Sequence, residues 1–388
     1  MEKKKDFQTG NIITISIAHL VHDTYSSFLA PLLPLLIEKF SISYSLAGLF
    51  TVFLRLPSLL NPVIGLIADK LPLRYFLIAA PAITSISMSL LGAAPSYFVA
   101  VIFLLFAGLG SSLFHTPAPV MIKHIAGSKI GRGMSIFMFA AEFARSLGPL
   151  LVLSAVSYWS LEETYKLIPI GLGASLVLFI RFRKIKIADD FKKNVEKKSA
   201  GKTLKSYSKT LFSLSGIIFF VNVTKSSLTA FLPTYLMVKG ESLWLAGAAL
   251  SILQFAGAVG TVSSGTISDK FGRSNTLLTI AIALPLLMWL FILWGDVLMV
   301  PILILMGFFF FASNPVMLAA INEIKSERPA FINGVYMTIN FAISAFTVTL
   351  VGALGDFIGL DTMYKVVSFF PLMAIPFILV LKQKNNYK

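Results

Sequence analysis

Twelve long runs of apolar residues restrict the possible folds of this chain more than any other feature. A helix needs about 20 residues to cross a bilayer core about 30 Å thick, and the runs are of that order. They are continuous, whereas the strands of a membrane barrel alternate between apolar and polar residues. We therefore predict an all-α polytopic membrane protein with transmembrane helices at 11–37, 45–68, 75–94, 97–122, 134–157, 164–181, 210–238, 243–268, 274–294, 297–321, 330–354 and 362–381.

The placement of the basic residues predicts how these helices are oriented. The formal net charge is +15, and 26 of the 33 lysines and arginines fall in the two tails and in alternate loops that we assign to one side. Short cytoplasmic loops are enriched in Lys and Arg, so we expect both termini in the cytoplasm and the protein in the cell membrane. The basic charge is then a topology signal that faces membrane lipids, and we expect no nucleic-acid partner.

The chain divides into two similar halves. We predict a six-helix bundle at 1–181, a basic cytoplasmic linker at 182–209 and a second six-helix bundle at 210–388. The triplet Leu32-Leu33-Pro34 recurs as Phe231-Leu232-Pro233, and Leu46-Ala47-Gly48 recurs as Leu245-Ala246-Gly247, each 199 residues later. Two pseudo-symmetric halves with a binding site near the membrane midplane are typical of secondary transporters. One chain contains both halves, so a monomer suffices.

A loop motif links the sequence to a known family. Gly65-x-x-x-Asp69-Lys70, followed by Arg74, and Gly265-x-x-x-Asp269-Lys270, followed by Arg273, stand at corresponding places in the two halves. Both copies resemble the cytoplasmic loop signature of the major facilitator superfamily. The first copy has Pro72 where the family has a glycine. The resemblance implies that these residues act as conformational latches, and a plain turn and topology role is the alternative.

Three further segments resemble the fosmidomycin-resistance branch of that superfamily, whose members export drugs in exchange for protons. They are His19-Leu-Val-His22-Asp23, the stretch from Gly108 to Pro117 with Phe114-His115, and Ser146-Leu-Gly148-Pro149. Gly148-Pro149 also resembles the antiporter signature of the fifth span. Small residues there allow close helix packing, and the proline frees a backbone carbonyl.

Ionisable residues inside a bilayer are costly, and they usually face a bundle interior or water. Most of those in the predicted spans belong to the first half, and we expect them to line one central cavity. They are His19, His22, Asp23, Arg55, His115, Glu142 and Arg145, whereas the second half places Lys225 well inside a span.

A proton carrier must change its charge during transport. Asp23 and Glu142 are the only acidic residues within the predicted spans, and histidine titrates near neutral pH. The candidates for proton coupling are therefore Asp23, Glu142, His19 and His22. Structural alternatives stay open: Asp23 pairs with His19 or Arg55, Glu142 and Arg145 form a packing salt bridge, and His115 donates to a backbone carbonyl.

The cations in the spans outnumber the carboxylates, because Arg55, Arg145 and Lys225 face only two acids. Such a site suits an anion, and a guanidinium binds phosphonate or carboxylate as a planar fork. The candidates for substrate binding are Arg55, His115, Arg145, Lys225, Asn222, Gln254, Asn314 and Asn340. For the amide residues, hydrogen bonds between helices are the alternative role. The candidates for gating are Gly65, Asp69, Lys70, Arg74, Gly265, Asp269, Lys270, Arg273, Gly148 and Pro149.

These features predict a secondary active transporter that exports a small anionic or amphipathic compound in exchange for protons. An importer or facilitator of an organic anion is the alternative. The sequence lacks the common hydrolase, nucleotide-binding and dinucleotide-binding motifs, so we expect no enzyme and no cofactor, with the proton gradient as the energy source. It also lacks cysteine, which excludes disulfides and cysteine metal sites.

Overall fold

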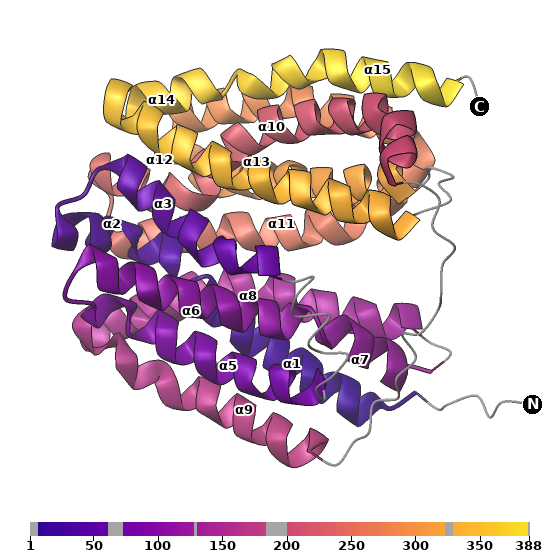
Figure 1. Ribbon diagram of the computed structural model, residues 1–388. Helices are drawn as coiled ribbons and strands as arrows, with labels where there is room; N and C mark the ends of the chain where they lie inside the picture. Colours follow the sequence, from indigo (N-terminus) through magenta and orange to yellow (C-terminus); the bar gives the residue numbers. More distant parts are fainter. Residues whose placement is uncertain (1–6, 61–72, 128–129, 184–199, 323–328, 387–388) are drawn as a thin grey trace, which may run out of the picture. The chain divides into compact units, whose positions relative to one another are not determined.

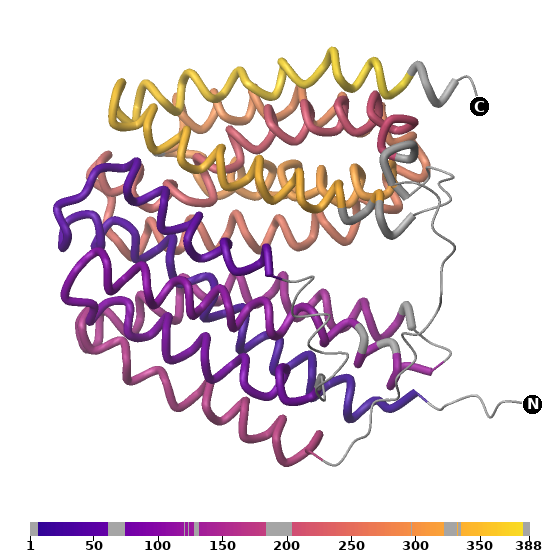
Figure 2. The backbone as a smooth tube through the Cα atoms, viewed as in Figure 1, coloured from indigo at the N-terminus to yellow at the C-terminus, as the bar shows by residue number. Residues whose placement is uncertain are grey.

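The structure is a computed structural model that describes residues 7–60, 73–127, 130–183, 200–322 and 329–386. Within these ranges every regular element is a helix, which confirms the all-α prediction (Figures 1 and 2). The elements are α1 (Thr9–Ser26), α2 (Leu29–Phe40), α3 (Tyr44–Arg55), η1 (Leu56–Leu60), α5 (Leu73–Ser89), η2 (Leu91–Ala93), α6 (Tyr97–His115), α7 (Ala118–Ile125), α8 (Ile130–Tyr158), η3 (Glu162–Leu167), α9 (Ile168–Phe182), α10 (Ala200–Val238), α11 (Leu243–Phe271), α12 (Arg273–Asn322), α13 (Pro329–Ile358), α14 (Leu360–Val367), η4 (Phe370–Ala374) and α15 (Ile375–Asn386).

The described residues contain eleven helical segments that are long and apolar enough to cross a membrane. A further apolar helix, Tyr44–Leu60, is shorter and is followed directly by residues 61–72, which lie outside the described ranges. The predicted spans at 274–294 and 297–321 lie within the single element α12, which has a non-helical backbone at Leu298. The chain is therefore a multi-pass membrane protein.

Several predicted spans are interrupted within the described residues, and the run 11–37, for example, divides into α1 and α2. Prolines account for two further interruptions. The run 97–122 divides into α6 and α7, because Pro117 has no N–H group and its ring clashes with the carbonyl four residues earlier. The last run divides into α14, η4 and α15, and Pro371 and Pro376 lie in the first turns of the two later pieces. Proline is tolerated in a first turn, where the missing N–H has no helical partner.

The chain forms two compact units. Unit 1 comprises Met1–Ile42, Phe50–Lys193 and Ser242–Ser251, and unit 2 comprises Ser43–Leu49, Asn194–Glu241 and Ile252–Lys388. In unit 1, α1 packs along α8, and α5 packs between α6 and α9 (Figure 1). In unit 2, α10 packs along α13.

Contacts within the units repeat with the period found in the sequence. A β-carbon on Gly108 would lie 2.1 Å from the carbonyl oxygen of Leu54, and one on Gly307 would lie 2.2 Å from that of Leu253, so glycine permits the same close helix approach in both units. Both pairs are related by a shift of 199 residues. The hydroxyl of Tyr25 donates to the carbonyl of Leu167, and that of Thr224 donates to the carbonyl of Val367.

Candidate functional site

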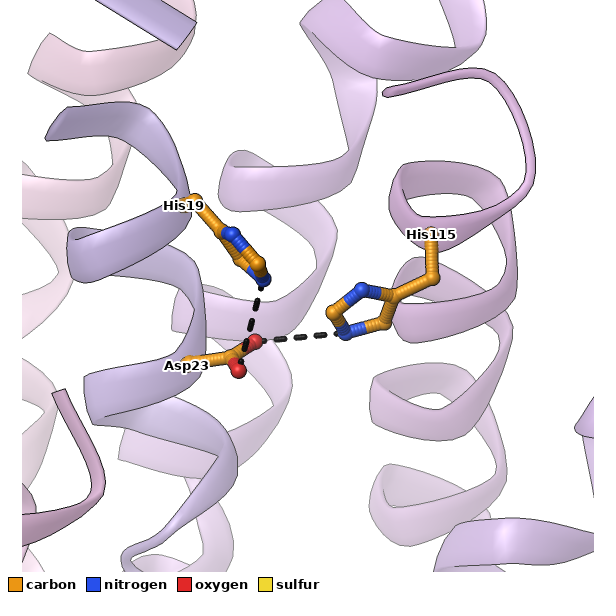
Figure 3. Close-up of side chains that lie close together, drawn as sticks. All are labelled: His19, Asp23 and His115. Carbon is orange, nitrogen blue, oxygen red and sulfur yellow. Dashed lines mark ion pairs between the residues drawn. The ribbon is translucent and has the colours of Figure 1, made fainter. Parts of the chain in front are cut away.

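An ionic cluster centred on Asp23 lies inside unit 1, where α1, α6 and α8 meet. Asp23 is 4% exposed. Its Oδ2 atom lies 3.5 Å from Nε2 of His19, one turn earlier on α1, and its Oδ1 atom lies 3.3 Å from Nε2 of His115 on α6 (Figure 3). From α8, Nη2 of Arg145 lies 3.9 Å from Oδ2. Residues four apart on a helix share one face, which explains the contact within α1.

The ring of His19 is held in place from its other side. Its Nδ1 atom lies 3.0 Å from the carbonyl oxygen of Phe137, and its ring stacks on the Phe137 ring with centroids 4.0 Å apart. A carbonyl oxygen only accepts hydrogen bonds, so Nδ1 carries a proton. In neutral His19, Nε2 therefore presents a lone pair toward Asp23. Sequence reasoning missed Phe137 because a backbone carbonyl carries no sequence signal.

His22 is fully buried beside the same carboxylate. Its Nε2 atom lies 3.9 Å from Oδ1 of Asp23. Its ring stacks on Phe114, with centroids 4.8 Å apart and ring planes 8° apart. His22 is therefore a neighbour of the cluster, farther from Asp23 than His19 and His115 are.

Arg145 connects Asp23 to the second buried acid, Glu142. The Nη1 atom of Arg145 lies 2.7 Å from Oε2 of Glu142, one turn earlier on α8. Glu142 is 7% exposed, whereas the Arg145 side chain keeps 37% of its surface accessible. Arg55, an exposed residue at the end of α3, is near enough to Arg145 for the two cations to repel each other. The accessible guanidinium group of Arg145 beside two buried carboxylates, with Arg55 as a neighbouring cation, can bind an anion.

Close packing of α8 against α1 supports this cluster. A β-carbon on Gly148 would lie 1.7 Å from Oγ of Ser27 and 2.7 Å from the carbonyl oxygen of Thr24, so only glycine fits there. Thr24 also donates through Oγ1 to the carbonyl of Ala144, at 3.5 Å. Pro149, the neighbour of Gly148, lies buried inside α8.

The remaining predicted substrate residues lie in unit 2. The side-chain amide of Asn222 donates to Oγ of Ser344 at 3.0 Å, and Nζ of Lys225 lies 4.1 Å from the centre of the Phe311 ring. Gln254, Asn314 and Asn340 are partly buried on α11, α12 and α13.

The repeat relates the ionic cluster of unit 1 to uncharged residues of unit 2. A shift of 199 residues pairs Asp23 with Asn222, Arg55 with Gln254, His115 with Asn314, and Arg145 with Ser344. The contact between Asp23 and Arg145 thus has a counterpart in the hydrogen bond between Asn222 and Ser344. Sequence reasoning missed Ser344, although this shift was the signal that identifies it. Charge is concentrated in one half. In the other half, amide or hydroxyl groups occupy these four equivalent places, whereas His19, His22 and Glu142 correspond to the apolar residues Ile218, Val221 and Phe341.

The second loop motif forms a compact turn between α11 and α12. Arg273 forms an ion pair with Asp269 and donates to the hydroxyl of Ser268 and to the carbonyl of Gly265, the last at 3.4 Å. Gly272 has φ of +84°, a conformation that side chains disfavour. Lys270 is exposed at the end of α11.

In the first loop motif, the predicted residues Gly65, Asp69 and Lys70 lie outside the described residues. Arg74 is described, and its guanidinium carbon lies 5.1 Å from the centre of the Tyr75 ring.

Comparisons with known proteins agree with this architecture. The family model of the Major Facilitator Superfamily matches residues 15–383. The chain is 27% identical over 375 residues to the Fosmidomycin resistance protein of Escherichia coli (strain K12), covering 94% of this chain and 91% of the relative. It is 24% identical over 388 residues to the uncharacterized MFS-type transporter YfnC of Bacillus subtilis (strain 168), covering 96% and 93%.

Solved structures show the same fold. A bacterial homologue of the human lysosomal transporter Spinster, in an inward-facing and occupied conformation, superimposes with a TM-score of 0.80 at 16% identity, covering 97% of each chain. A D-xylose–proton symporter superimposes with a TM-score of 0.73 at 15% identity, again covering 97% of each chain.

Proposed function

The chain belongs to the Major Facilitator Superfamily and is a membrane transporter rather than an enzyme, and from this premise we propose that it exports a small organic anion in exchange for protons. The observation that carries the proposal is the ion-pair network of Asp23, Arg145 and Glu142 inside unit 1. It combines cations that attract an anion with buried carboxylates that can take up a proton. The Escherichia coli relative is named for resistance to fosmidomycin, which is the effect that export of such a compound would have.

Anion recognition is assigned to Arg145 and Arg55. Arg145 has accessible surface although both of its carboxylate partners are buried, so it can bind a ligand without leaving Glu142. A planar guanidinium binds phosphonate, phosphate or carboxylate through two parallel hydrogen bonds. Lys225 and the uncharged groups Asn222, Gln254, Asn314 and Asn340 are assigned to the substrate as well, as a further cation and as hydrogen-bonding partners.

Proton coupling is assigned to Asp23 and Glu142, with His19 and His22 as neighbours of Asp23. Exchange requires that substrate and proton exclude each other. A substrate that donates hydrogen bonds to one of these carboxylates does so more strongly when the carboxylate is ionised, so binding of the substrate weakens binding of the proton. The proton gradient then drives export without a cofactor.

A specific observation also favours the second candidate, an importer that carries anion and proton together. Protonation of Asp23 or Glu142 removes a negative charge beside Arg145 and makes the site more attractive to an anion. By electrostatics alone, binding of the proton therefore strengthens binding of the anionic substrate. The direction in which a proton moves with the substrate distinguishes the two functions.

The test uses purified protein in vesicles that enclose a pH-sensitive dye, with no initial proton gradient. Fosmidomycin, a simple phosphonate or a carboxylate is added outside. Exchange makes the interior alkaline as substrate enters, whereas cotransport makes it acidic. Either pH change should be lost in Asp23→Asn or Glu142→Gln and retained in Glu163→Gln, which removes an exposed acid outside the cluster. Flux of labelled substrate without any pH change would overturn proton coupling.

We assign the protein to the cell membrane with both termini in the cytoplasm, and a single chain as the working unit. The basic residues that predict this orientation face the anionic lipids of the inner leaflet.

A further inference from the structure

The three side chains drawn in Figure 3 have the composition of a transition-metal site. Their donor atoms are Nε2 of His19, a carboxylate oxygen of Asp23 and Nε2 of His115, all within 4.8 Å of one another. Two imidazoles and one carboxylate are a common set of protein ligands for zinc and similar divalent ions. We propose that His19, Asp23 and His115 bind a divalent transition-metal ion such as Zn²⁺.

The separations of the donor atoms match the size of such an ion. Ligands about 2.0–2.2 Å from a tetrahedral zinc ion are roughly 3.3–3.6 Å from one another. The structure has 3.5 Å between Nε2 of His19 and Oδ2 of Asp23, and 3.3 Å between Nε2 of His115 and Oδ1 of Asp23. These two distances end on different carboxylate oxygens, and the set of three donors spans up to 4.8 Å, so side-chain rotation must bring the donors to one point.

The hydrogen bonding of His19 prepares it as a ligand. Because the carbonyl of Phe137 accepts from Nδ1, the Nε2 atom of neutral His19 carries the lone pair. A hydrogen bond from the second ring nitrogen to a carbonyl is the usual support of a metal-bound histidine, since it fixes the tautomer and the ring orientation. The stacking of His19 on Phe137 restricts the ring further.

Four buried atoms at this place have no hydrogen-bond partner among the described residues, and two of the four are the ring nitrogens of His22. The other two belong to the proposed ligands. They are Nε2 of His19, in a side chain 1% exposed, and Oδ1 of Asp23, in a side chain 5% exposed. A buried polar atom without a hydrogen bond is costly, and Oδ1 of Asp23 has the Nε2 atom of His115 3.3 Å away but no hydrogen bond to it. The lone pair on Nε2 of neutral His19 likewise gains nothing from facing a carboxylate. A cation between them satisfies both atoms at once.

Neither the neighbouring cation nor the available space prevents an ion from binding here. Arg145 is the competing cation, but it lies 2.7 Å from Glu142 and 3.9 Å from Asp23, so its closer partner is Glu142. His115 has 39% of its side chain exposed, which provides access for the ion and a position for a water as fourth ligand. Calcium and magnesium are poor candidates because they prefer six or more oxygen ligands.

Binding of an ion here does not depend on the proposed function. A bound ion would also inhibit transport, because an ion held by Asp23 occupies the carboxylate that we assign to the proton. This second effect rests on the proposed function. The two proposals can therefore fail separately: direct binding tests the metal site, and the vesicle assay tests proton coupling.

The experiment measures Zn²⁺ binding by calorimetry on the purified full-length protein in detergent, with a purification tag that contains no histidine. The chain has no cysteine and four histidines, so competing sites are few. We expect one Zn²⁺ per chain. His115→Ala and Asp23→Asn should weaken binding by more than the about 10- to 100-fold that loss of a supporting partner costs. His124→Ala, a histidine on α7, is the matched control and should bind as the original protein does.

Substitution of Co²⁺ provides a second measurement. The visible bands of Co²⁺ become stronger when it leaves water for a four-coordinate site, and we expect this change in the original protein and in His124→Ala but not in His115→Ala. His115 is partly exposed, so its variant is expected to fold even if Asp23→Asn does not. No stoichiometric binding of Zn²⁺, full binding by His115→Ala, or equal loss in His124→Ala would each overturn the proposal.

Discussion

Gly148 on α8 lies so close to Ser27 on α1 that a β-carbon at position 148 would be 1.7 Å from the Ser27 hydroxyl oxygen. The same β-carbon would be 2.7 Å from the backbone carbonyl of Thr24, which a rotation of Ser27 cannot relieve. We expect Gly148→Ala to destabilise the protein by about 1–3 kcal/mol through overpacking. Thermal unfolding of the purified protein measures the effect.

Gly173 on α9 is the matched control for this substitution, because a β-carbon there would have no neighbour within 4 Å. Gly173→Ala should be neutral or stabilising by up to about 1 kcal/mol, since alanine is the better helix former. Equal unfolding temperatures for the two variants would show that α1 and α8 are less closely packed than described.

The role of the guanidinium groups predicts a loss of affinity without unfolding. We expect Arg145→Ala and Arg55→Ala each to weaken binding of a phosphonate about 10- to 100-fold, because a hydrogen bond to a charged group contributes about 1.5–3 kcal/mol. Calorimetry with fosmidomycin as the probe measures this. Arg181→Ala, which removes an exposed arginine bonded to Asn11, serves as the control. Unchanged affinity in both site variants would contradict anion binding at this place.

The equivalent hydrogen bonds of Tyr25 and Thr224 predict similar losses of stability in both units. Tyr25→Phe and Thr224→Val each leave a buried carbonyl without its donor, at Leu167 and Val367 respectively. We expect each to cost about 1–3 kcal/mol. In Thr349→Val, the lost hydroxyl bonds only within its own helix, at 3.3 Å, and the unfolding temperature should stay close to that of the original protein. A loss confined to one unit would argue against equivalent roles.

The loop motif predicts an effect on rate and not on affinity. Arg273 binds Asp269 and the carbonyl of Gly265 in the turn between α11 and α12, outside the ionic cluster. If this turn acts as a latch, Asp269→Asn and Arg273→Ala should slow transport about tenfold, corresponding to about 1.4 kcal/mol in a barrier, and leave substrate affinity unchanged. Lys209→Ala removes an exposed cation elsewhere and controls for surface charge. A fall in affinity with an unchanged rate would contradict a latch.

The proposed orientation can be tested directly because the chain has no cysteine. Single cysteines at Glu163, whose side chain is 42% exposed, and at Ser208, which is exposed, lie on opposite predicted sides of the membrane. In intact cells a membrane-impermeant maleimide should label Glu163→Cys, and it should label Ser208→Cys only after the cells are opened. The reverse pattern would place the termini outside.

The helices, the internal repeat and one ion pair can be predicted from the sequence alone. They depend on residues close together in the chain or on a repeated pattern. Apolar runs of membrane-spanning length predict the helices, since a backbone in lipid must satisfy its own hydrogen bonds. The shift of 199 residues relates the two halves, and the contacts of Gly108 and Gly307 follow it. The pairing of Glu142 with Arg145 is similarly local, because residues three apart share a helix face.

The helix breaks were harder to place, because a proline in an apolar run is compatible with either a kink or a stop. Pro34 lies inside α2, whereas Pro117 separates α6 from α7. Neighbouring helices decide between these outcomes by satisfying, or not satisfying, the freed backbone groups.

The neighbourhood of Asp23 depends on tertiary packing. His115 is far from Asp23 in the chain, and only the meeting of α1 and α6 brings its Nε2 atom to 3.3 Å. The carbonyl of Phe137 determines which nitrogen of His19 carries the proton, and a backbone group has no signature in the sequence. The helices, their repetition and the residue types available for chemistry can all be read along the chain. Which of these residues share protons, ions or ligands depends on folding, because such interactions act over a few ångströms in space and not along the chain.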